Sequence, residues 1–271
     1  MKPFIDIIRP FNCAMAALGV FVGYVVSAGV FALPMQLVLA MVSAFAICGG
    51  GQAINDFFDA EIDRKIKPHR VIPRGDLDTK TAFLYSILLF SAGVILAYFI
   101  TPVSFFIAAT FAVLLSMYAA FVQQYKFIGN ALVASGTAVT LIYGASISGD
   151  YSLVAIFAMS AFLTNMGREI TKDIEDVRGD KGVKTTTPML IGKEAASMLV
   201  LLFYTLGIII AGYAWFSGAA GSIFYAVLVA ISAAGFALSY LQLVKGDAAA
   251  SQRYSKGAMF IALLAFLAAA L

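Results

Sequence analysis

The chain has 271 residues, of which 62% are hydrophobic and only 12% are charged, and its formal net charge at pH 7 is +3. A soluble domain of this length could not bury so much apolar surface, so the composition excludes a soluble globular protein. Apolar runs of about 20 residues recur along the chain, each long enough to cross a bilayer, and they predict an all-α polytopic membrane protein.

In chain order, the apolar runs predict nine transmembrane helices, which we expect to form one bundle and a single domain over residues 1–271. The first run lacks a cleavage-site pattern, so it is expected to be a transmembrane helix and not a secretory signal. Pro34 and Pro102 indicate two of the tight turns. The predicted spans cover residues of about 11–30, 35–57, 80–100, 103–123, 127–147, 151–171, 194–215, 219–243 and 255–271.

The basic residues are distributed asymmetrically along this predicted topology. All 18 of them fall before span 1, in the connections after spans 2, 4, 6 and 8, or at the span ends beside those connections, which lie on the same side of the membrane. The positive-inside rule therefore predicts a cytoplasmic N-terminus, cytoplasmic charged loops and an outside C-terminus. Of the 15 acidic residues only Asp150 lies on the opposite side, and the rule does not account for the others.

Two acidic clusters follow spans 2 and 6. In each, carboxylates recur at helical spacing on one face, where like charges destabilise a helix by a few tenths of a kcal/mol per pair unless a cation lies between them. The first cluster consists of Asn55, Asp56, Asp59 and Asp63, and the second of Glu169, Asp173, Asp176 and Asp180.

Paired carboxylate clusters next to Lys and Arg suit the binding of Mg²⁺ and phosphate. Mg²⁺ is usually held by one or two carboxylates together with substrate phosphates. We therefore expect each cluster to hold one Mg²⁺ on a shared diphosphate, with nearby basic residues binding the remaining oxygens. Such a site stabilises the charge that develops on a leaving diphosphate.

A cation transporter or channel is the alternative from another class of protein. Transporters often have inverted repeats with binding sites at the bilayer midplane. Here the clusters are four spans apart, so any repeat is parallel, and both clusters lie at one face of the membrane. This arrangement favours an enzyme.

The two clusters resemble the motifs of the UbiA superfamily of intramembrane prenyltransferases. The first matches the pattern NDxxDxxxD at Asn55–Asp63, and the second matches DxxDxxxD at Asp173–Asp180. The nine-helix layout is also similar, so the resemblance covers nearly the whole chain. It implies an enzyme with two Mg²⁺ ions bridging a prenyl diphosphate.

Other positions also fit this family. Arg9-Pro10 matches an Arg-Pro pair before the first helix, and Lys126 matches a basic residue after the fourth. The loop at 69–75 shares Arg70, Pro73 and Gly75 with the family pattern but departs from it at Val71 and Arg74. Arg74 is a cation where a small residue is common, and an extra phosphate contact is one role for it.

The segment "REITKDIEDVRGD" resembles the branch of the family that makes archaeal ether lipids. This resemblance implies geranylgeranyl diphosphate as donor and geranylgeranylglyceryl phosphate, a lipid phosphate of the membrane, as acceptor. An aromatic acceptor, such as a quinone precursor or a porphyrin, is the alternative within the family. Neither a nucleic acid nor an obligate protein partner is expected.

The resemblance also assigns roles to individual residues. The metal ligands would be Asn55, Asp56, Asp59, Asp63, Asp173, Asp176 and Asp180. Of these, Asp59, Asp63, Asp173 and Asp176 would be catalytic. The diphosphate and phosphate contacts would be Arg9, Asn55, Arg70, Arg74, Lys126, Arg168, Lys172 and Lys181.

Overall fold

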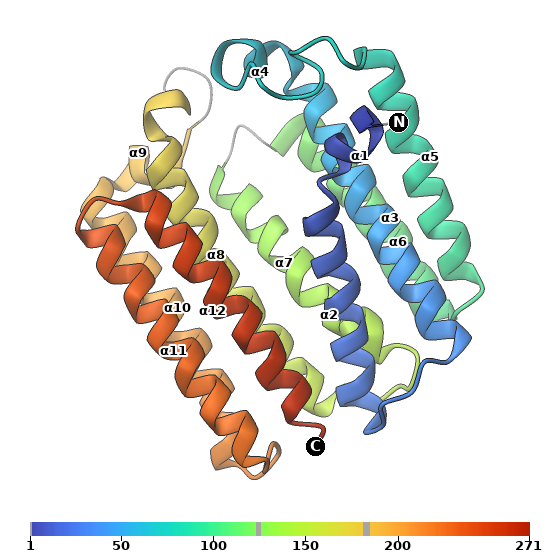
Figure 1. Cartoon of the computed structure of the whole chain (residues 1–271), viewed down its shortest axis with the longest axis vertical. Helices are drawn as coiled ribbons and strands as arrows, with labels where there is room; N and C mark the ends of the chain where they lie inside the picture. The colour runs from blue at the N-terminus through green and yellow to red at the C-terminus, as the bar shows by residue number, and fades with distance from the viewer. Residues whose placement is uncertain (1, 123–125, 181–184) are drawn as a thin grey trace. The chain divides into compact units, whose positions relative to one another are not determined.

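A computed structural model describes residues 2–122, 126–180 and 185–271 of the chain. The regular structure in these ranges is helical, which confirms the predicted all-α class (Figure 1). The helices are α1 (Lys2–Ile8), α2 (Pro10–Ala28), α3 (Met35–Phe58), α4 (Ala60–Ile66), α5 (Thr79–Tyr98), α6 (Pro102–Met117), a π-helical turn (Tyr118–Val122), α7 (Lys126–Ala145), α8 (Ser152–Asp180), α9 (Thr187–Ile191), α10 (Lys193–Phe216), α11 (Ile223–Val244) and α12 (Ala248–Ala268).

Eight helices in the described ranges are long and apolar enough to cross a membrane: α2, α3, α5, α6 with its π-helical turn, α7, α8, α10 and α11. They coincide with the first eight predicted spans to within a few residues, except that α8 continues to Asp180. Pro34 and Pro102 lie at the starts of α3 and α6, as predicted. The predicted ninth span corresponds to α12, which is not among the eight, so a count of nine stays a prediction.

The chain divides into two compact units. Unit 1 consists of Met1–Phe21 and Ala32–Gln123, and unit 2 of Val22–Phe31 and Gln124–Leu271. The first acidic cluster belongs to unit 1 and the second to unit 2. The single domain predicted for residues 1–271 stays a prediction.

In unit 1, α3 packs against α1, α5 and α6. The glycines at 49–51 make this possible, because successive helical residues point about 100° apart and so meet three different neighbours. A Cβ added at each glycine in turn would lie 3.3 Å from Ile8 of α1, 2.9 Å from Phe90 of α5 and 3.0 Å from Leu115 of α6. The three glycines therefore let α3 approach these neighbours closely, next to the first cluster.

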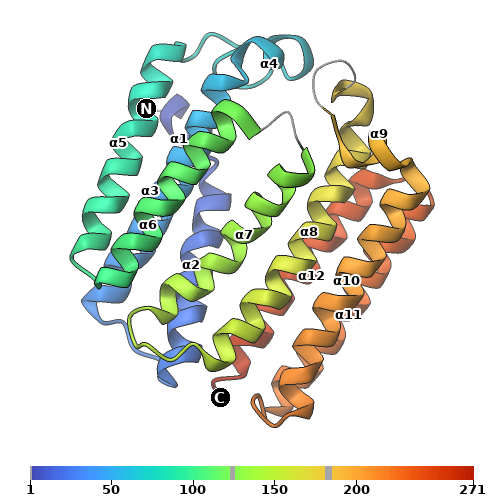
Figure 2. The same cartoon turned by 180° about the vertical axis from the view of Figure 1, so that it is seen from behind.

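In unit 2, α8 packs against α7, α10 and α12, and α11 pairs with α12 (Figure 2). The rings of Phe157 in α8 and Phe266 in α12 stack with their centroids 4.3 Å apart. Near the other end of α8, Ile170 and Ile174 lie in a buried cluster with Val200 and Phe236. The helix that carries the second acidic cluster is thus held on several sides.

The same helix contact occurs once in each unit. In unit 1 the Ser43 hydroxyl of α3 donates to the Gly93 carbonyl of α5 at 2.7 Å, and in unit 2 Ser160 of α8 donates to Gly207 of α10 at 2.8 Å. An aromatic ring accompanies each of these contacts. In unit 1, Phe90 of α5, one turn before Gly93, packs on Gly50 of α3. In unit 2, Tyr204 of α10, one turn before Gly207, packs on Gly167 of α8. Each acidic cluster therefore lies toward the C-terminal end of a helix with the same packing pattern, which agrees with the expectation that any repeat is parallel.

Candidate active site

The first cluster lies where α3 gives way to α4. Asp59 stands between the two helices, and its backbone N–H donates to the Asn55 carbonyl at 2.9 Å. The Asp63 N–H then donates to the Asp59 carbonyl at 2.8 Å. Because the i to i+4 bonding runs through the junction, Asn55, Asp59 and Asp63 share one face, as the sequence predicts.

Two arginines bind the carboxylates of this cluster. Arg70 Nη1 contacts Asp63 Oδ2 at 2.5 Å and Asp56 Oδ1 at 3.2 Å, and Arg9 Nη2 contacts Asp56 Oδ1 at 2.5 Å. Asp56 and Asp63 are only 3% and 4% exposed, so cationic partners are needed to offset the loss of hydration. The structure thus brings Arg9 and Arg70 together with the predicted metal ligands.

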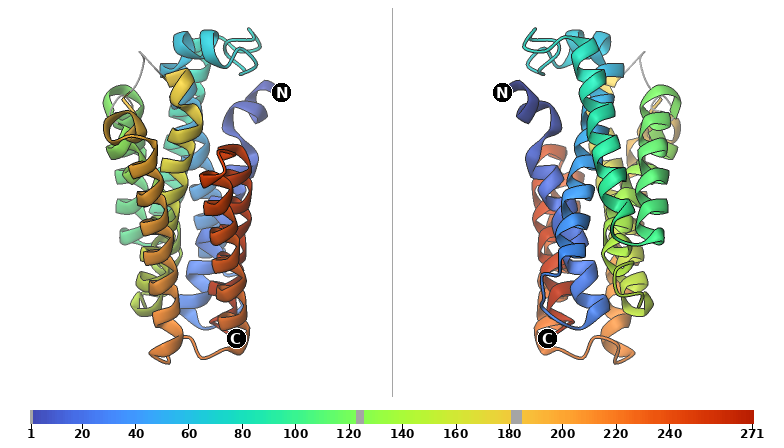
Figure 3. Two further views of the ribbon diagram at one scale, coloured as in Figure 1. Left: turned by 90° about the vertical axis from the view of Figure 1, so that its left-hand side faces the viewer. Right: turned by 90° about the vertical axis from the view of Figure 1, so that its right-hand side faces the viewer.

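Arg9 has an unusual backbone. Its φ of 51° is positive, the only such value among the non-glycine residues that the structure describes. It lies at the bend between α1 and α2, directly before Pro10, and Figure 3 shows this bend near the N-terminus. A positive φ costs a non-glycine residue about 1–3 kcal/mol and persists only where surrounding contacts hold it. Here the Arg9 side chain is held by its bonds to Asp56 and Gln52. Burial lowers the pKa of the Arg9 guanidinium, and Asp56 acts in the opposite direction.

Arg74 points elsewhere in the structure. Its Nε donates to Asp76 Oδ2 at 2.7 Å, its Nη2 lies 3.9 Å from Asp6, and its side chain is 47% exposed. The bond to Asp76 raises the pKa of Arg74. The structure therefore does not bring Arg74 together with Asp56 and Asp63, and its phosphate contact stays a prediction.

Asn55 has a buried oxygen without a partner. Its Oδ1 is inaccessible to solvent and accepts no hydrogen bond. A buried acceptor left in this state costs about 1–3 kcal/mol, so it needs an explanation. An amide oxygen is a hard donor of the kind that Mg²⁺ prefers, and carboxylates lie at the adjacent positions, so the residues present fit a magnesium ion. Among the described residues, however, no three Asp, Glu, His or Cys side chains converge as a ready-made metal site.

The second cluster lies on the continuous helix α8. Asp173 is 1% exposed and accepts a hydrogen bond from Asn130 Nδ2 of α7 at 2.7 Å. Glu169, also buried, accepts from Arg168 Nη1 at 2.6 Å and from Lys172 Nζ at 3.4 Å. The structure therefore places the predicted cations Arg168 and Lys172 beside this cluster.

Some predicted residues of the second cluster are described only in part. Asp176 is half-buried on the same face as Asp173. Asp180 ends α8 and Lys126 begins α7, but the structure describes neither side chain, and Lys181 lies outside the described residues. The roles of these residues stay predictions.

The sequence reasoning missed two side chains that hold the clusters. Gln52 accepts from Arg9 in unit 1, and Asn130 donates to Asp173 in unit 2. Asn130 could have been found, because a polar residue inside a predicted apolar span is expensive and usually functional. Gln52, one turn before Asp56, is likewise a polar residue inside a predicted apolar span.

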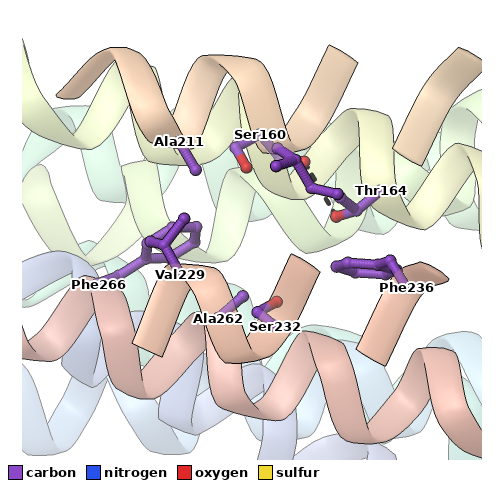
Figure 4. Close-up of a pocket in the computed structure, with 9 residues that line it drawn as sticks. Ser160, Thr164, Ala211, Val229, Ser232, Phe236, Ala262 and Phe266 are labelled. Carbon is purple, nitrogen blue, oxygen red and sulfur yellow. Dashed lines mark hydrogen bonds between the residues drawn. The ribbon is translucent and has the colours of Figure 1, made fainter. Parts of the chain in front are cut away.

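A small pocket in unit 2 does not carry the chemistry. It lies among α8, α10, α11 and α12, and Figure 4 shows its lining residues. Its hydroxyls are used by the backbone, because Ser160 donates to Gly207, Thr164 to the Ser160 carbonyl at 3.0 Å and Ser232 to Ala258. The pocket therefore reflects helix packing and offers no carboxylate or cation to a diphosphate.

These features agree with comparisons to known proteins. Residues 16–264 match the model of the UbiA prenyltransferase family. The chain therefore belongs to this family and is a prenyltransferase and a multi-pass membrane protein. It is 38% identical to the digeranylgeranylglyceryl phosphate synthase of Thermococcus kodakarensis, over 100% of this chain and 98% of that protein. It is 36% identical to the synthase of the same name from Methanopyrus kandleri, over 100% of both.

Solved structures have the same fold. A structure described as digeranylgeranylglyceryl phosphate synthase in membranes superposes with a TM-score of 0.83 at 31% identity, covering 99% of this chain and 98% of that one. A UbiA homologue from Archaeoglobus fulgidus, bound to GPP and Mg²⁺, gives a TM-score of 0.72 at 19% identity, covering 97% of this chain and 99% of that one. At that identity, the second likeness shows the fold alone.

Proposed function

We propose that this protein transfers a geranylgeranyl group from geranylgeranyl diphosphate to the free hydroxyl of geranylgeranylglyceryl phosphate. The products are digeranylgeranylglyceryl phosphate and diphosphate. The observation that carries this proposal is the full-length similarity, at 36–39% identity, to relatives named for this product. The proposed reaction is a step in the synthesis of archaeal membrane ether lipids.

The proposed reaction uses a divalent metal ion, Mg²⁺. The residues that would hold Mg²⁺ are Asn55, Asp56, Asp59 and Asp63 in unit 1 and Asp173, Asp176 and Asp180 in unit 2. Bound Mg²⁺ would stabilise the negative charge that develops on the diphosphate as it leaves. The Mg²⁺ and GPP bound to the Archaeoglobus fulgidus homologue support the use of a divalent metal. The number of ions we propose, two, follows from the presence of two clusters.

The side chains of the site would position and neutralise the donor. Arg9 and Arg70 lie against Asp56 and Asp63. If these carboxylates bind Mg²⁺, the two guanidinium groups would be free to bind phosphate oxygens of the donor. Of the acidic residues on the shared faces, Asp59, Asp63, Asp173 and Asp176 would be the catalytic ones. Lys126, Lys181 and Arg74 would add further contacts to phosphate.

The reaction then exchanges one C–O bond for another. The bond between the prenyl C1 and the diphosphate oxygen breaks, its electron pair leaves with the diphosphate, and an allylic cation forms. The glycerol hydroxyl oxygen attacks this carbon and loses its proton to a carboxylate of the site or to the leaving diphosphate. Stabilisation of the diphosphate is thus the largest contribution required of the protein.

The proposed location is the cytoplasmic membrane. The N-terminus and the loops that carry the acidic clusters would face the cytoplasm, and the C-terminus would lie outside with α12 as a ninth span. The distribution of all 18 basic residues supports this orientation.

An acceptor panel tests the proposed function. The purified protein would be given geranylgeranyl diphosphate and Mg²⁺ with geranylgeranylglyceryl phosphate, a quinone precursor or a porphyrin, and the products identified by mass spectrometry. We expect transfer to the lipid phosphate alone. Transfer only to an aromatic acceptor would replace the proposed acceptor, and cation flux in proteoliposomes without prenyl transfer would favour the transporter alternative.

A further inference from the structure

Arg168, Lys172 and Lys256 form a cationic cluster within unit 2. Arg168 and Lys172 lie on α8 and both contact the buried carboxylate of Glu169, at 2.6 and 3.4 Å. Lys256 comes from α12 and interacts electrostatically with Arg168, Lys172 and Glu169. Two helices far apart in the sequence thus contribute cations to one place.

Two further contacts between α8 and α12 also place Lys256 near Arg168 and Lys172. The Gln252 amide of α12 donates to Glu175 of α8 near the charged end of the pair. At the other end, Phe157 stacks on Phe266. The two helices are therefore antiparallel, and Lys256, one turn beyond Gln252, falls opposite the Arg168–Lys172 segment.

The charges of the cluster do not cancel. Arg168 and Lys172 contact the carboxylate of Glu169, which is 4% exposed. Lys256 interacts with Glu169 and also with Glu175, whose charge remains because the Gln252 amide that donates to it is neutral. Three cations therefore face two carboxylates, and these five groups together carry one excess positive charge.

The depth of the cluster makes this excess costly. Arg168 and Lys172 lie within Ser152–Val177, a segment apolar enough to span the membrane. Ionisable side chains inside such a segment are expensive, and they usually mark the path of a charged substrate. The Arg168 side chain is 19% exposed and that of Lys172 is 41% exposed, so an anion can reach both.

The cationic cluster meets the second acidic cluster at Glu169 and lies beside its aspartates. Lys172 and Asp176 are four residues apart, about 6 Å along the helix axis. At about 100° per residue, Arg168 lies about 140° around α8 from Asp173. A group bound by the cations would therefore lie beside the carboxylates without occupying their place.

We propose that Arg168, Lys172 and Lys256 bind the phosphate monoester of the lipid acceptor, and that the donor diphosphate does not use this cluster. This inference rests on the proposed function. A phosphate monoester carries about −1.5 to −2 charges at pH 7, which complements the excess positive charge. Because the acceptor hydroxyl is close to its phosphate, binding here holds that hydroxyl within about one helical turn of Asp176.

Steady-state kinetics with Lys256→Ala tests this assignment. We expect the KM for geranylgeranylglyceryl phosphate to rise about 10-fold or more and the KM for geranylgeranyl diphosphate to stay unchanged, because one charge-assisted contact to the acceptor is lost. Lys256→Arg should restore most of the affinity, and Lys256→Gln should repeat the loss. The matched control is Arg253→Ala, an exposed cation on the same helix, for which we expect no change.

A second acceptor separates phosphate binding from other effects. With geranylgeranylglycerol, which lacks the phosphate, the wild type and Lys256→Ala should react at the same low rate. A rise in the KM of the donor, an equal loss with the phosphate-free acceptor, or unchanged kinetics in both the Ala and Gln variants would overturn the assignment. A wild-type protein that uses no lipid phosphate acceptor at all would instead contradict the proposed function, and this inference with it.

Discussion

At the scale of single residues, the site combines satisfied and unsatisfied polar groups. Asp56 and Asp63 are buried but have arginine partners, so their charges are offset in the protein itself. The oxygen of Asn55 is buried without a partner. A group that costs stability in the free protein and fits a metal ion is expected to contribute to ligand binding.

Substitution of Asn55 tests this expectation. For Asn55→Leu we expect the free energy of unfolding without Mg²⁺ to stay unchanged or to rise by up to about 1–3 kcal/mol, because the buried oxygen has no hydrogen bond to lose and its removal ends the cost of burying it unpaired. The Mg²⁺ concentration for half-maximal prenyl transfer should rise about 10-fold or more. Asn55→Asp, which keeps an oxygen at the position, is the control. An unchanged Mg²⁺ dependence in Asn55→Leu would show that the oxygen is not a ligand.

The carboxylate of Asp78 should make the stability of the folded protein depend on pH. Its carboxylate caps α5 by accepting from the Thr81 N–H at 2.9 Å and the Thr81 hydroxyl at 2.7 Å, and these bonds lower the pKa of Asp78. A lowered pKa in the folded state means that the stabilisation is complete above the ordinary value of about 3.9 and is lost as the pH falls through the folded value.

The measurement compares wild type with Asp78→Asn, which can still cap the helix but cannot titrate. In thermal unfolding in detergent, the wild type should be more stable at pH 7, and the difference should shrink below about pH 4. A difference that stays constant over this range would mean that the charge of Asp78 does not contribute.

At the scale of helices, close contact between pairs sets the position of each acidic cluster. Gly207 of α10 lies against Ser160 and Thr164 of α8, and an added Cβ would be 2.6 Å from Thr164 Cγ2 and 3.1 Å from the Ser160 carbonyl oxygen. One methyl group would therefore push α10 away from the helix that carries Asp173.

Two glycine substitutions on α10 test this contact. Gly207→Ala should lower the free energy of unfolding by about 1–3 kcal/mol, because the added carbon overpacks the interface. Gly212→Ala, where no atom lies within 4 Å of the added carbon, should leave stability unchanged or raise it by about 0.5–1 kcal/mol. Equal effects of the two in chemical denaturation would contradict the role assigned to the contact.

At the scale of the whole molecule, the sequence predicted the apolar helices well and the polar connections poorly. Length and hydropathy suffice for a span, so α2, α3, α5 and α10 match their predictions closely. Hydropathy ended the sixth predicted span at 171, and only the helical spacing of the acidic residues indicated that α8 continues to Asp180. The same spacing indicated α4, whereas the short helices α1 and α9 were missed because they contain no long apolar run.

The candidate site shows a similar division. Helical spacing was enough to predict the shared face of Asn55, Asp59 and Asp63. The partner of Arg74 could not be predicted, because a loop arginine can reach either a neighbouring carboxylate or a substrate, and only the fold shows that it contacts Asp76. Lys256 was likewise unassigned, since its closeness to Arg168 depends on how α12 packs on α8.

The central claim is that the two acidic clusters together perform prenyl transfer, and transfer rates of Asp59→Asn and Asp176→Asn test it most directly. Each substitution keeps the size of the side chain but removes one carboxylate, so Mg²⁺-dependent transfer from geranylgeranyl diphosphate should fall about 100-fold or more in either variant. Near-normal, Mg²⁺-dependent turnover in both folded variants would contradict the claim.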